Sequence, residues 1–392
     1  MRIVDVCAFY TPLGGGVKTY VERKVRAGIE AGHEVTILAP GPRPGVVELG
    51  PSGRIVTIAG RRFPLDLRYS YFDDEPALHD MLDALDPDFV EASSPWTSAA
   101  MVGRWQGRAA RALVMHADPL AAYAYRWFGK VATRATIDRK FGWFWNHLRR
   151  LDGAFDMVVS ASRALSDRLS AGGLAGTVTI PMGVEPGIFS PRLRDEELRA
   201  RLLRHCQLPR TATLLVGLGR FAPEKRWPMV IDAVTAAGID HPVGMVLIGD
   251  GRDKARLSRS VAHNPHVRLL APIRDREMLA QILASADGLV HGCEAETFCM
   301  AVSEARASGL PVIVPDAGGA SDQYLRDQGA IYRAGDGASL ASALKDFVAR
   351  NPETQRRLAA AAAGRVRSMD QHFRDLFGVY EVSGRRGRCL AC

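Results

Sequence analysis

The chain begins with Met1-Arg-Ile-Val-Asp-Val-Cys7, continues through Thr11-Pro-Leu-Gly-Gly-Gly16, and then reaches Glu34-Val-Thr-Ile-Leu38. The first and last stretches are short apolar runs of the kind that forms buried strands. Between them, apolar residues recur four positions apart, at Val17, Val21, Val25 and Ile29. Strand, glycine loop, helix and strand in this order make a βαβ unit, which predicts a parallel sheet.

The same order returns halfway along the chain. Thr213-Leu-Leu-Val-Gly-Leu-Gly219 and Val243-Gly-Met-Val-Leu-Ile-Gly249 are apolar strands on either side of a loop and a helical pattern. We expect further strands at Ile55–Ile58, Phe89–Ala92, Ala112–Met115, Met157–Ser160, Thr177–Pro181, Val267–Leu270, Gly288–His291 and Pro311–Pro315. A length of 392 residues suits two domains. The predicted fold class is therefore α/β, with two doubly wound, Rossmann-like domains.

The boundary between the halves follows Met182-Gly-Val-Glu-Pro-Gly-Ile-Phe189, whose glycines and prolines suit a linker. We expect an N-terminal domain over residues 1–185, a linker over 186–210 and a C-terminal domain over 211–370. Residues 371–392 form a tail whose first part, up to Val382, has helical spacing.

Bulk composition excludes several classes of protein. Apolar residues make up 47% and charged residues 24%, so the chain is not disordered as a whole. No apolar run reaches the roughly 18–20 residues that span a bilayer, and Met1–Tyr10 is a poor signal peptide. The six cysteines lack zinc-site spacing and indicate reduced thiols. We therefore expect a cytoplasmic protein.

The net charge of +8 comes from 51 basic and 43 acidic residues, and it is concentrated in one segment. Arg104 to Arg150 holds ten basic residues against Asp118 and Asp138, together with four of the six tryptophans. A basic, aromatic segment in an otherwise neutral chain indicates a surface that meets an anionic partner.

In open parallel sheets, ligands bind beyond the carboxyl ends of the strands, so the loops there carry the chemistry. The loop Gly14–Gly16 fits a phosphate or sugar contact, or simply a tight turn. In the matching loop of the second half, Arg220 and Lys225 suit a diphosphate, the alternative being two solvated surface cations.

The strongest motif is Glu294-Ala-Glu296-Thr-Phe-Cys-Met-Ala-Val-Ser-Glu304-Ala-Arg-Ala-Ser-Gly-Leu-Pro-Val-Ile-Val314. It predicts a loop carrying Glu296 and a helix beginning near Thr297 or Phe298, with Glu304 about two turns further on. Backbone N–H groups from Thr297 to Cys299 would then bind phosphate, while Glu304 accepts ribose hydroxyls and Glu296 accepts sugar hydroxyls. Alternatively, Glu296 merely complements the helix dipole.

These motifs together resemble the signature of the retaining glycosyltransferases of family 4. The two glutamates with seven residues between them, followed by Ser308-Gly-Leu-Pro-Val312, match that family's pattern, and so does Gly219-Arg220 with Glu224-Lys225. The similarity covers nearly the whole chain. It departs from the family at Cys299, where a glycine is usual, and at Met182, where asparagine is commoner.

The resemblance implies a GT-B fold, in which two domains face each other across a cleft and the C-terminal helix crosses back to the first domain. It implies a nucleoside-diphosphate sugar as donor, transfer with retained configuration, no cofactor and no metal. By position, His116 matches the histidine near the transferred sugar, and it joins Glu296 as a catalytic candidate. The donor-binding candidates are Gly15, Gly16, Arg220, Lys225, Ile273, Thr297, Phe298, Cys299 and Glu304.

The acceptor is expected on the N-terminal side, where the basic segment lies. Arg126, Lys130 and Arg134 are spaced as a stripe on one helix face, and Trp127, Trp143 and Trp145 lie near them. This pattern suits an anionic membrane interface and a lipid acceptor, and hence a peripheral protein on the inner face of the membrane. The alternative is a pair of helices that bury their aromatic side and expose a basic side.

Three further functions remain open at this stage. The first is transfer to a soluble saccharide or small molecule, the second is the reaction of a GT-B epimerase or phosphorylase, and the third is nucleic-acid binding. No nucleic-acid-binding module is visible in the sequence, so we expect no nucleic acid partner.

Overall fold

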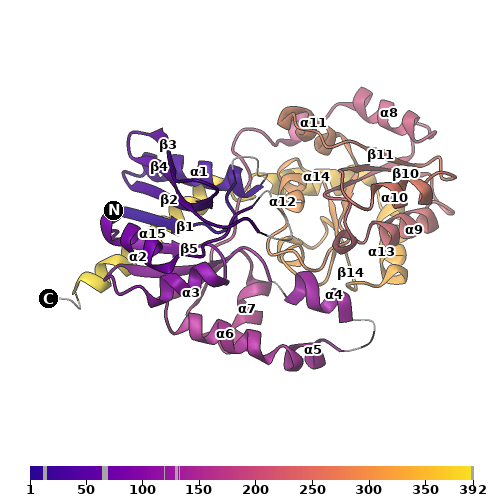
Figure 1. The fold of residues 1–392 in the computed structure, drawn as a ribbon. Helices are drawn as coiled ribbons and strands as arrows, with labels where there is room; N and C mark the ends of the chain where they lie inside the picture. The colour runs from indigo at the N-terminus through magenta and orange to yellow at the C-terminus, as the bar shows by residue number, and fades with distance from the viewer. Residues whose placement is uncertain (12–15, 64–68, 119, 129–130, 132, 390–392) are drawn as a thin grey trace.

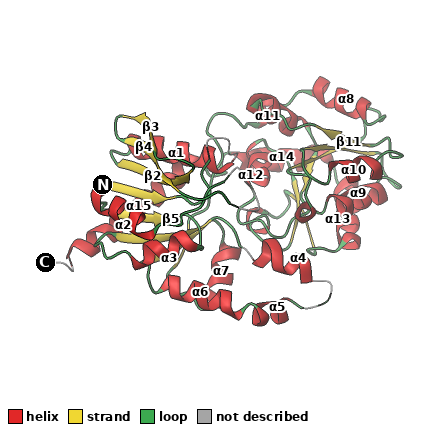
Figure 2. Cartoon of the chain, in the orientation of Figure 1, coloured by secondary structure: helices red, strands yellow, loops and turns green. Residues whose placement is uncertain are grey.

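The computed structural model describes residues 1–392 apart from 12–15, 64–68, 119, 129–130, 132 and 390–392. It contains two α/β domains that lie side by side, each built on a parallel sheet with helices on both faces (Figure 1, Figure 2). The fold class expected from the sequence is confirmed.

The N-terminal sheet has the strand order β3-β4-β2-β1-β5-β6-β7-β8. Its strands are β1 (Arg2–Val6), β2 (Glu34–Gly41), β3 (Gly45–Gly50), β4 (Gly53–Ala59), β5 (Phe89–Ala92), β6 (Ala110–Met115), β7 (Met157–Ser160) and β8 (Thr177–Thr179). Every pairing in this sheet is parallel except the one between β3 and β4.

The C-terminal sheet has the order β11-β10-β9-β12-β13-β14, and all its pairings are parallel. Its strands are β9 (Thr213–Leu218), β10 (Val243–Ile248), β11 (Val267–Leu270), β12 (Gly288–Val290), β13 (Val312–Pro315) and β14 (Gly329–Tyr332). Successive strands are added on one side of β9 up to β11 and on its other side from β12 onward. The loops after β9 and β12 therefore flank the point where ligands bind in such sheets.

The α-helices of the N-terminal half are α1 (Gly16–Glu30), α2 (Glu75–Leu85), α3 (Thr97–Arg104), α4 (Tyr125–Phe128), α5 (Arg134–Lys140), α6 (Gly142–Asp152) and α7 (Arg163–Ala171). Those that follow are α8 (Glu196–His205), α9 (Trp227–Ala237), α10 (Lys254–Ser260), α11 (Arg276–Ser285), α12 (Met300–Ala307), α13 (Gly337–Ala349), α14 (Pro352–Ala363) and α15 (Met369–Cys389). The described residues also include a π-helical turn at Leu120–Ala124 and 3₁₀ turns at Pro191–Leu193, Pro223–Lys225 and Ser321–Gln323.

Successive residues of each strand pack on opposite faces of the sheet, as the strand period requires. In β1, Val4 joins a core with α2, α3, α6 and α7, whereas Ile3 packs against α1 and α15. In the other sheet, Leu214 faces α8, α11 and α12, while Leu215 faces α9 and α13. The near-continuous apolar strands thus reflect burial on both faces.

Helix α15 ends the chain on the N-terminal domain, where Figure 1 shows it in yellow beside the indigo strands. Phe373 and Tyr380 are fully buried there, and the Tyr380 ring stacks on Phe89 at 4.0 Å between centroids. The last helix therefore holds the two halves together, since the segment before it belongs to the C-terminal domain.

A buried charge cluster lies beneath α15. The ammonium of Lys24 on α1 bonds Asp5 of β1 at 3.0 Å and also contacts Glu91 of β5, and none of the three side chains reaches solvent. The Tyr380 hydroxyl donates to Glu91 at 2.6 Å. Because two carboxylates share one cation, their pKa values diverge. Burial and the nearby charge of Glu91 raise the pKa of Asp5 to about 6, whereas Lys24 and Tyr380 outweigh burial and lower the pKa of Glu91.

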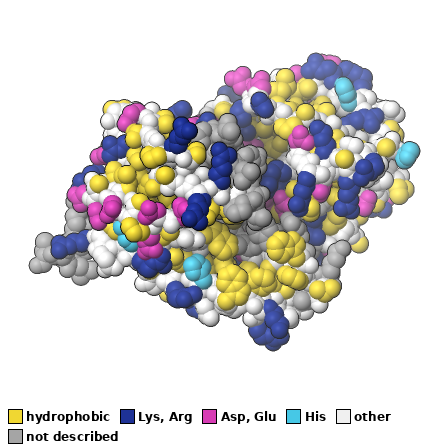
Figure 3. Space-filling model, in the orientation of Figure 1, with side chains coloured by type: hydrophobic (Ala, Val, Ile, Leu, Met, Phe, Trp, Pro, Cys, Tyr) yellow, Lys and Arg dark blue, Asp and Glu magenta, His cyan; other side chains and the backbone are white. Residues whose placement is uncertain are grey.

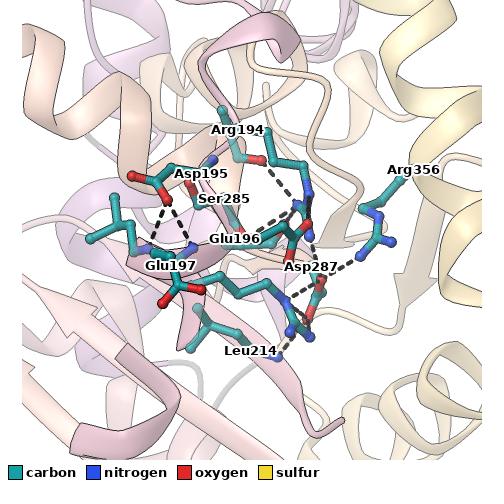
Figure 4. A network of polar contacts seen from close by, with 12 residues as sticks. Arg194, Asp195, Glu196, Glu197, Leu214, Ser285, Asp287 and Arg356 are labelled. Atoms are coloured by element: carbon teal, nitrogen blue, oxygen red, sulfur yellow. Dashed lines mark hydrogen bonds and ion pairs between the residues drawn. The ribbon is translucent and has the colours of Figure 1, made fainter. Parts of the chain in front are cut away.

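A second cluster fixes the start of the C-terminal domain, as Figure 4 shows. Three arginines converge on buried Asp287, which also accepts the backbone N–H of Leu214 at 2.8 Å. They are Arg194 before α8, Arg199 on α8 and Arg356 on α14. Asp287 directly precedes β12 and thus anchors the linker at the edge of the sheet remote from the strands' carboxyl ends.

Two strands were absent from the expectations. β3 is exposed except at half-buried Leu49 and carries no alternating pattern, and β14 is a short edge strand. The helix expected near Thr297 or Phe298 begins only at Met300, because Cys299 adopts a left-handed backbone with φ 74°.

We predict that Asp5→Asn changes how stability depends on pH. The folded pKa of Asp5, about 6, exceeds its ordinary value of 3.8, so the folded state holds that proton between about pH 4 and 6. Raising the pH through this window should therefore lower the free energy of unfolding of the natural protein. The variant should lose less over the same window, by about 1 kcal/mol or more. The readout is the thermal midpoint at pH 4.5 and pH 7, with exposed Asp80→Asn as control. Parallel pH profiles for all three proteins would contradict it.

Candidate active site

The loops at the carboxyl ends of both sheets meet around a cavity of about 610 Å³, here called the Lys225 cavity. It is lined by residues that follow β6, β9, β10 and β12, among them His116, Arg220, Lys225, Arg252 and Glu296. Four loops distant in sequence thus bring cations, a histidine and a carboxylate to one place.

Lys225 and Glu296 form the central ion pair of this cavity, and both side chains are mostly buried. The imidazole of His291, at the end of β12, lies 3.4 Å from the same carboxylate. Burial alone would raise the pKa of Glu296, but His291 and Lys225 outweigh it and hold this pKa well below its usual range. Glu296 is therefore an ionised hydrogen-bond acceptor at neutral pH.

A neighbouring pair joins the same two loops. Arg226 has a left-handed backbone conformation directly after the 3₁₀ turn. Its guanidinium donates to both carboxylate oxygens of Glu294, from Nε at 2.8 Å and from Nη2. The loop after β13 supports them from behind, since the Gly319 N–H donates to the Glu296 carbonyl at 2.7 Å. A Cβ at Gly319 would lie 2.5 Å from the Thr297 carbonyl oxygen, so this close approach requires glycine.

Cys299 occupies a backbone conformation that favours glycine. The strain is localised before α12, and the thiol is buried with its sulfur 3.5 Å from His291 Nε2. Cysteine therefore stands where the family pattern usually has glycine, at a position whose φ is 74°.

Glu304 lies outside the Lys225 cavity, in different surroundings from Glu296. It is buried on α12 and accepts a 2.6 Å bond from Arg276, and burial raises its pKa despite that cation. Phe298 is buried next to Cys299, and Ile273 is half-buried against the core between β11 and α11. The two carboxylates that the spacing predicted on one side of the cleft are therefore held by different partners.

The remaining donor candidates vary in placement. The Arg220 side chain is 78% exposed and pairs with Glu224 at 3.2 Å on the rim of the Lys225 cavity. Gly16 is the first residue of α1, while Gly15 lies outside the described residues.

His116 follows β6 and opens onto the Lys225 cavity. The surrounding protein lowers the pKa of its imidazole, so the ring is neutral at pH 7. Its ring meets the edge of Tyr20 at 5.4 Å between centroids, and its backbone carbonyl accepts a 2.9 Å bond from the Thr297 hydroxyl. That bond directly joins the two domains at the cavity.

A second cavity of about 710 Å³, here called the Arg168 cavity, adjoins the first. The two share the lining residues Asp118, Ala295, Glu296 and Thr297. The Arg168 cavity extends from this shared wall toward α5, α6 and α7.

The basic segment does not form one helix. Thr133 caps α5 by accepting the Thr136 N–H, so Arg126 on α4 and Arg134 on α5 belong to different helices. The expected stripe on one helix face is therefore wrong. Lys130 lies outside the described residues, as do the side chains of Arg126 and Arg134.

The aromatic residues of the segment divide between surface and core. Trp127 and Trp143 are 62% and 60% exposed, whereas Trp145 is buried among α6 and its neighbours. Figure 3 shows hydrophobic side chains gathered over α4 and α6, with basic side chains beside them. Trp145 therefore belongs to a buried aromatic side, as the second alternative expects, whereas the membrane interface at the exposed tryptophans stays a prediction.

Sequence reasoning missed several contributors. His291 lies at the carboxyl end of an expected strand, so its position was a usable signal. Arg276 and Arg168 carried none, because each meets its carboxylate partner only through the tertiary fold.

One group of side chains has the composition of a metal site. Ligand atoms of His291, Glu296 and Cys299 lie within 4.8 Å of one another. However, Lys225 already neutralises Glu296, and burial raises the pKa of the Cys299 thiol well above its usual value. His291 thus contacts both Cys299 and Glu296, and Glu296 also pairs with Lys225.

Within the described part of the chain, no helix combines the length and apolar character needed to cross a membrane.

Comparison with known families gives matches to both halves. Residues 14–187 match the model of Glycosyltransferase Family 4, and residues 203–365 match that of Glycosyl transferases group 1. Together these ranges cover most of the chain, and each falls mainly on one of the two sheets.

Individual proteins extend the similarity over the full length. A GDP-mannose-dependent alpha-mannosyltransferase of Mycobacterium tuberculosis is 32% identical, over 98% of each chain. A GDP-mannose-dependent alpha-(1-6)-phosphatidylinositol dimannoside mannosyltransferase of the same species is also 32% identical, over 92% of this chain and 91% of its own. Among solved structures, sucrose-phosphate synthase from Thermosynechococcus elongatus superposes with a TM-score of 0.74 at 20% identity, covering 97% of this chain and 98% of its own.

Proposed function

The chain belongs to the GT-B glycosyltransferases of family 4, and on that premise we propose that it transfers mannose from GDP-mannose to a hydroxyl of a membrane glycolipid. The observation that carries this proposal is the Lys225 cavity, where loops of both domains place cations and an ionised carboxylate together. The names of the two mycobacterial relatives support mannose and guanine in the donor, and one supports a phosphatidylinositol-type acceptor.

The chemistry of transfer follows from the charges in the Lys225 cavity. The difficult event is departure of a diphosphate, whose growing negative charge is stabilised by nearby cations. Lys225 and Arg220 supply them, Lys225 from a fixed position and Arg220 from the exposed rim. Glu296, held ionised, accepts hydrogen bonds from hydroxyls of the transferred sugar, and His116 faces the same space.

Retention and metal independence are part of the proposal. Glu296 is already engaged by Lys225 and His291, which favours a role in binding over attack on the anomeric carbon. Attack from the face of the departing diphosphate, with phosphate oxygen accepting the acceptor's proton, would retain configuration. The cations near the diphosphate make a divalent ion unnecessary.

The donor and the stereochemistry can be tested together. Among GDP-mannose, UDP-glucose and ADP-glucose, we expect GDP-mannose to raise the thermal midpoint most and to be the donor consumed with membrane lipid extract. The product should carry an α-mannosyl linkage by NMR, and excess EDTA should leave the rate unchanged. A β-linkage, or loss of activity with EDTA, would contradict retention or metal independence respectively. Donor breakdown without any acceptor product would favour an epimerase or hydrolase.

Lys225→Ala and Glu304→Ala should each lower turnover at least about tenfold, equivalent to about 1.4 kcal/mol in the barrier. The first removes the cation paired with Glu296, and the second leaves Arg276 without its buried partner. Exposed Lys254→Ala and Glu277→Ala are matched controls in the same domain. Near-natural turnover in both site variants, with unchanged thermal midpoints, would reject the assignment.

The exposed face of α4 and α6 supports attachment to an anionic membrane surface. Trp127 and Trp143 project there with the exposed arginines Arg149 and Arg150, a combination that suits the lipid headgroup region. A lipid acceptor would then be met at the surface that contains it.

Flotation with vesicles containing phosphatidylglycerol tests this attachment. We expect binding at low salt, weaker binding at about 0.5 M salt because exposed charges are screened, and several-fold loss in Trp127→Ser/Trp143→Ser. Ile239→Ser, which removes an exposed apolar residue of the other domain, should bind as the natural protein does. Equal flotation of all three proteins, or none at any salt, would reject membrane attachment.

A further inference from the structure

The Arg168 cavity is built by both domains around one immobilised arginine. Arg168 of α7 pairs with Asp118 and, at 3.2 Å, with Asp138. Its guanidinium also lies 4.8 Å from the ring centre of Tyr125 and 5.1 Å from that of Trp145. With two carboxylates and two rings around it, Arg168 is a positioning residue rather than a free cation.

The charges that line this cavity are mainly acidic. Among the described lining residues are five carboxylates, Asp118, Asp138, Glu294, Glu296 and Asp316, against two guanidinium groups, Arg149 and Arg168. Glu294 and Glu296 are paired with Arg226 and Lys225, and Arg168 is offset by its two aspartates. Among the lining residues that the structure describes, the inner cavity therefore has no surplus positive charge to attract a phosphate or a sulfate.

Such a lining suits a ring that carries many hydroxyl groups. Ionised carboxylates are acceptors only, and each can receive hydrogen bonds from two hydroxyls. Both Asp138 and Asp316 are only partly occupied by their partners in the protein. Asp138 accepts from Tyr125 and Arg168, and one oxygen of Asp316 accepts the Ala334 N–H at 2.8 Å.

Among the described lining residues, Arg149, at the outer end of the cavity, is the cation that is not paired with a carboxylate. Arg149 lines the cavity and also a shallow hollow on α6 formed with Trp143, Asn146 and Arg150. Both arginines are exposed, and Arg149 is held by bonds to the Gly172 carbonyl and to Asn146, each 2.6 Å long. The inner end is the wall shared with the Lys225 cavity, at Asp118, Glu296 and Thr297.

We propose that the Arg168 cavity is the acceptor site, that it binds an uncharged polyol ring, and that the acceptor's phosphate stays outside at Arg149 and Arg150. This rests on the proposed function, since it places the acceptor hydroxyl against the wall behind which the donor sugar lies. Asp138 and Asp316 bind the ring hydroxyls, and Arg168 fixes Asp138 and Asp118 in place.

The test compares soluble acceptors in which only the charge on the ring differs. The probes are octyl α-mannoside and octyl α-glucoside, the 6-phosphate of each, and dispersed phosphatidylinositol. We expect at least one uncharged ring to be mannosylated and its phosphorylated form to have a kcat/KM at least tenfold lower. Equal use of both forms, or use of no uncharged ring by a protein that still hydrolyses GDP-mannose, would overturn the proposal.

Variants locate the ring and the phosphate separately. Asp138→Asn and Asp316→Asn should each raise KM for the accepted uncharged ring at least fivefold, with kcat within about twofold and donor hydrolysis unchanged. Asp167→Asn, on the exposed side of α7, is the matched control. Arg149→Ala/Arg150→Ala should raise KM for phosphatidylinositol at least fivefold, and by a clearly larger factor than KM for the uncharged ring.

The outcomes separate this proposal from the function on which it rests. If Asp138→Asn and Asp316→Asn have natural KM values for the ring, or if the double arginine variant affects both acceptors alike, the acceptor assignment fails while the donor chemistry stands. If the natural protein neither binds nor hydrolyses GDP-mannose, the proposed function itself fails.

Discussion

Parallel strand direction is the constraint on which the active site depends. Apart from the β3–β4 pair, all strand pairings in both sheets are parallel, so within each sheet the loops that leave these strands emerge along a common edge. The carboxyl edges of the two sheets meet, which explains how His116 after β6, Lys225 after β9 and Glu296 after β12 line one cavity. No local motif could assemble these residues, because each lies on a different loop.

Charge compensation is the second organising feature. Buried Lys24 and half-buried Lys225 and Arg168 are matched to carboxylates from other elements: Lys24 to Asp5 and Glu91, Lys225 to Glu296, and Arg168 to Asp118 and Asp138. Isolated buried charges are costly, and pairing of this kind is what keeps them ionised inside the protein. The net charge of +8 is therefore carried largely at the surface, and some of the basic side chains there also have partners within the protein. Arg104 pairs with Glu75, and half-buried Arg111 donates to the Gly107 carbonyl.

The sequence allowed the two-sheet fold to be predicted, because apolar strands and glycine-rich turns are local signals. Five of the candidate residues line the Lys225 cavity, namely His116, Arg220, Lys225, Glu296 and Thr297. Prediction from the sequence failed where a tertiary or backbone detail decides. Thr133 caps a new helix and so interrupts the supposed basic stripe, and Cys299 turns left-handed and so delays α12. Trp143 and Trp145, two residues apart, face solvent and core respectively, which only the packing of α6 determines. The Arg168 cavity was invisible because its arginine and aspartates lie 50 and 30 residues apart.

The two cavities are coupled because both need the domains to be in contact. The Thr297 hydroxyl donates to the His116 carbonyl at the wall between the two cavities. In the C-terminal domain, Asp322 lies in the 3₁₀ turn between β13 and β14 and accepts the Ala164 N–H at the start of α7. Helix α7 carries Arg168, so the second contact fixes the helix that shapes the Arg168 cavity. A shift of one domain against the other would therefore alter both cavities at once, separating Glu296 from Asp118 as well as Thr297 from His116. Helix α15 restrains such a shift, because it returns the chain to the N-terminal domain and is held there by Tyr380 on Glu91. The charge cluster beneath α15 thus stabilises, from the far side of the N-terminal sheet, the relative position of the domains on which both cavities depend.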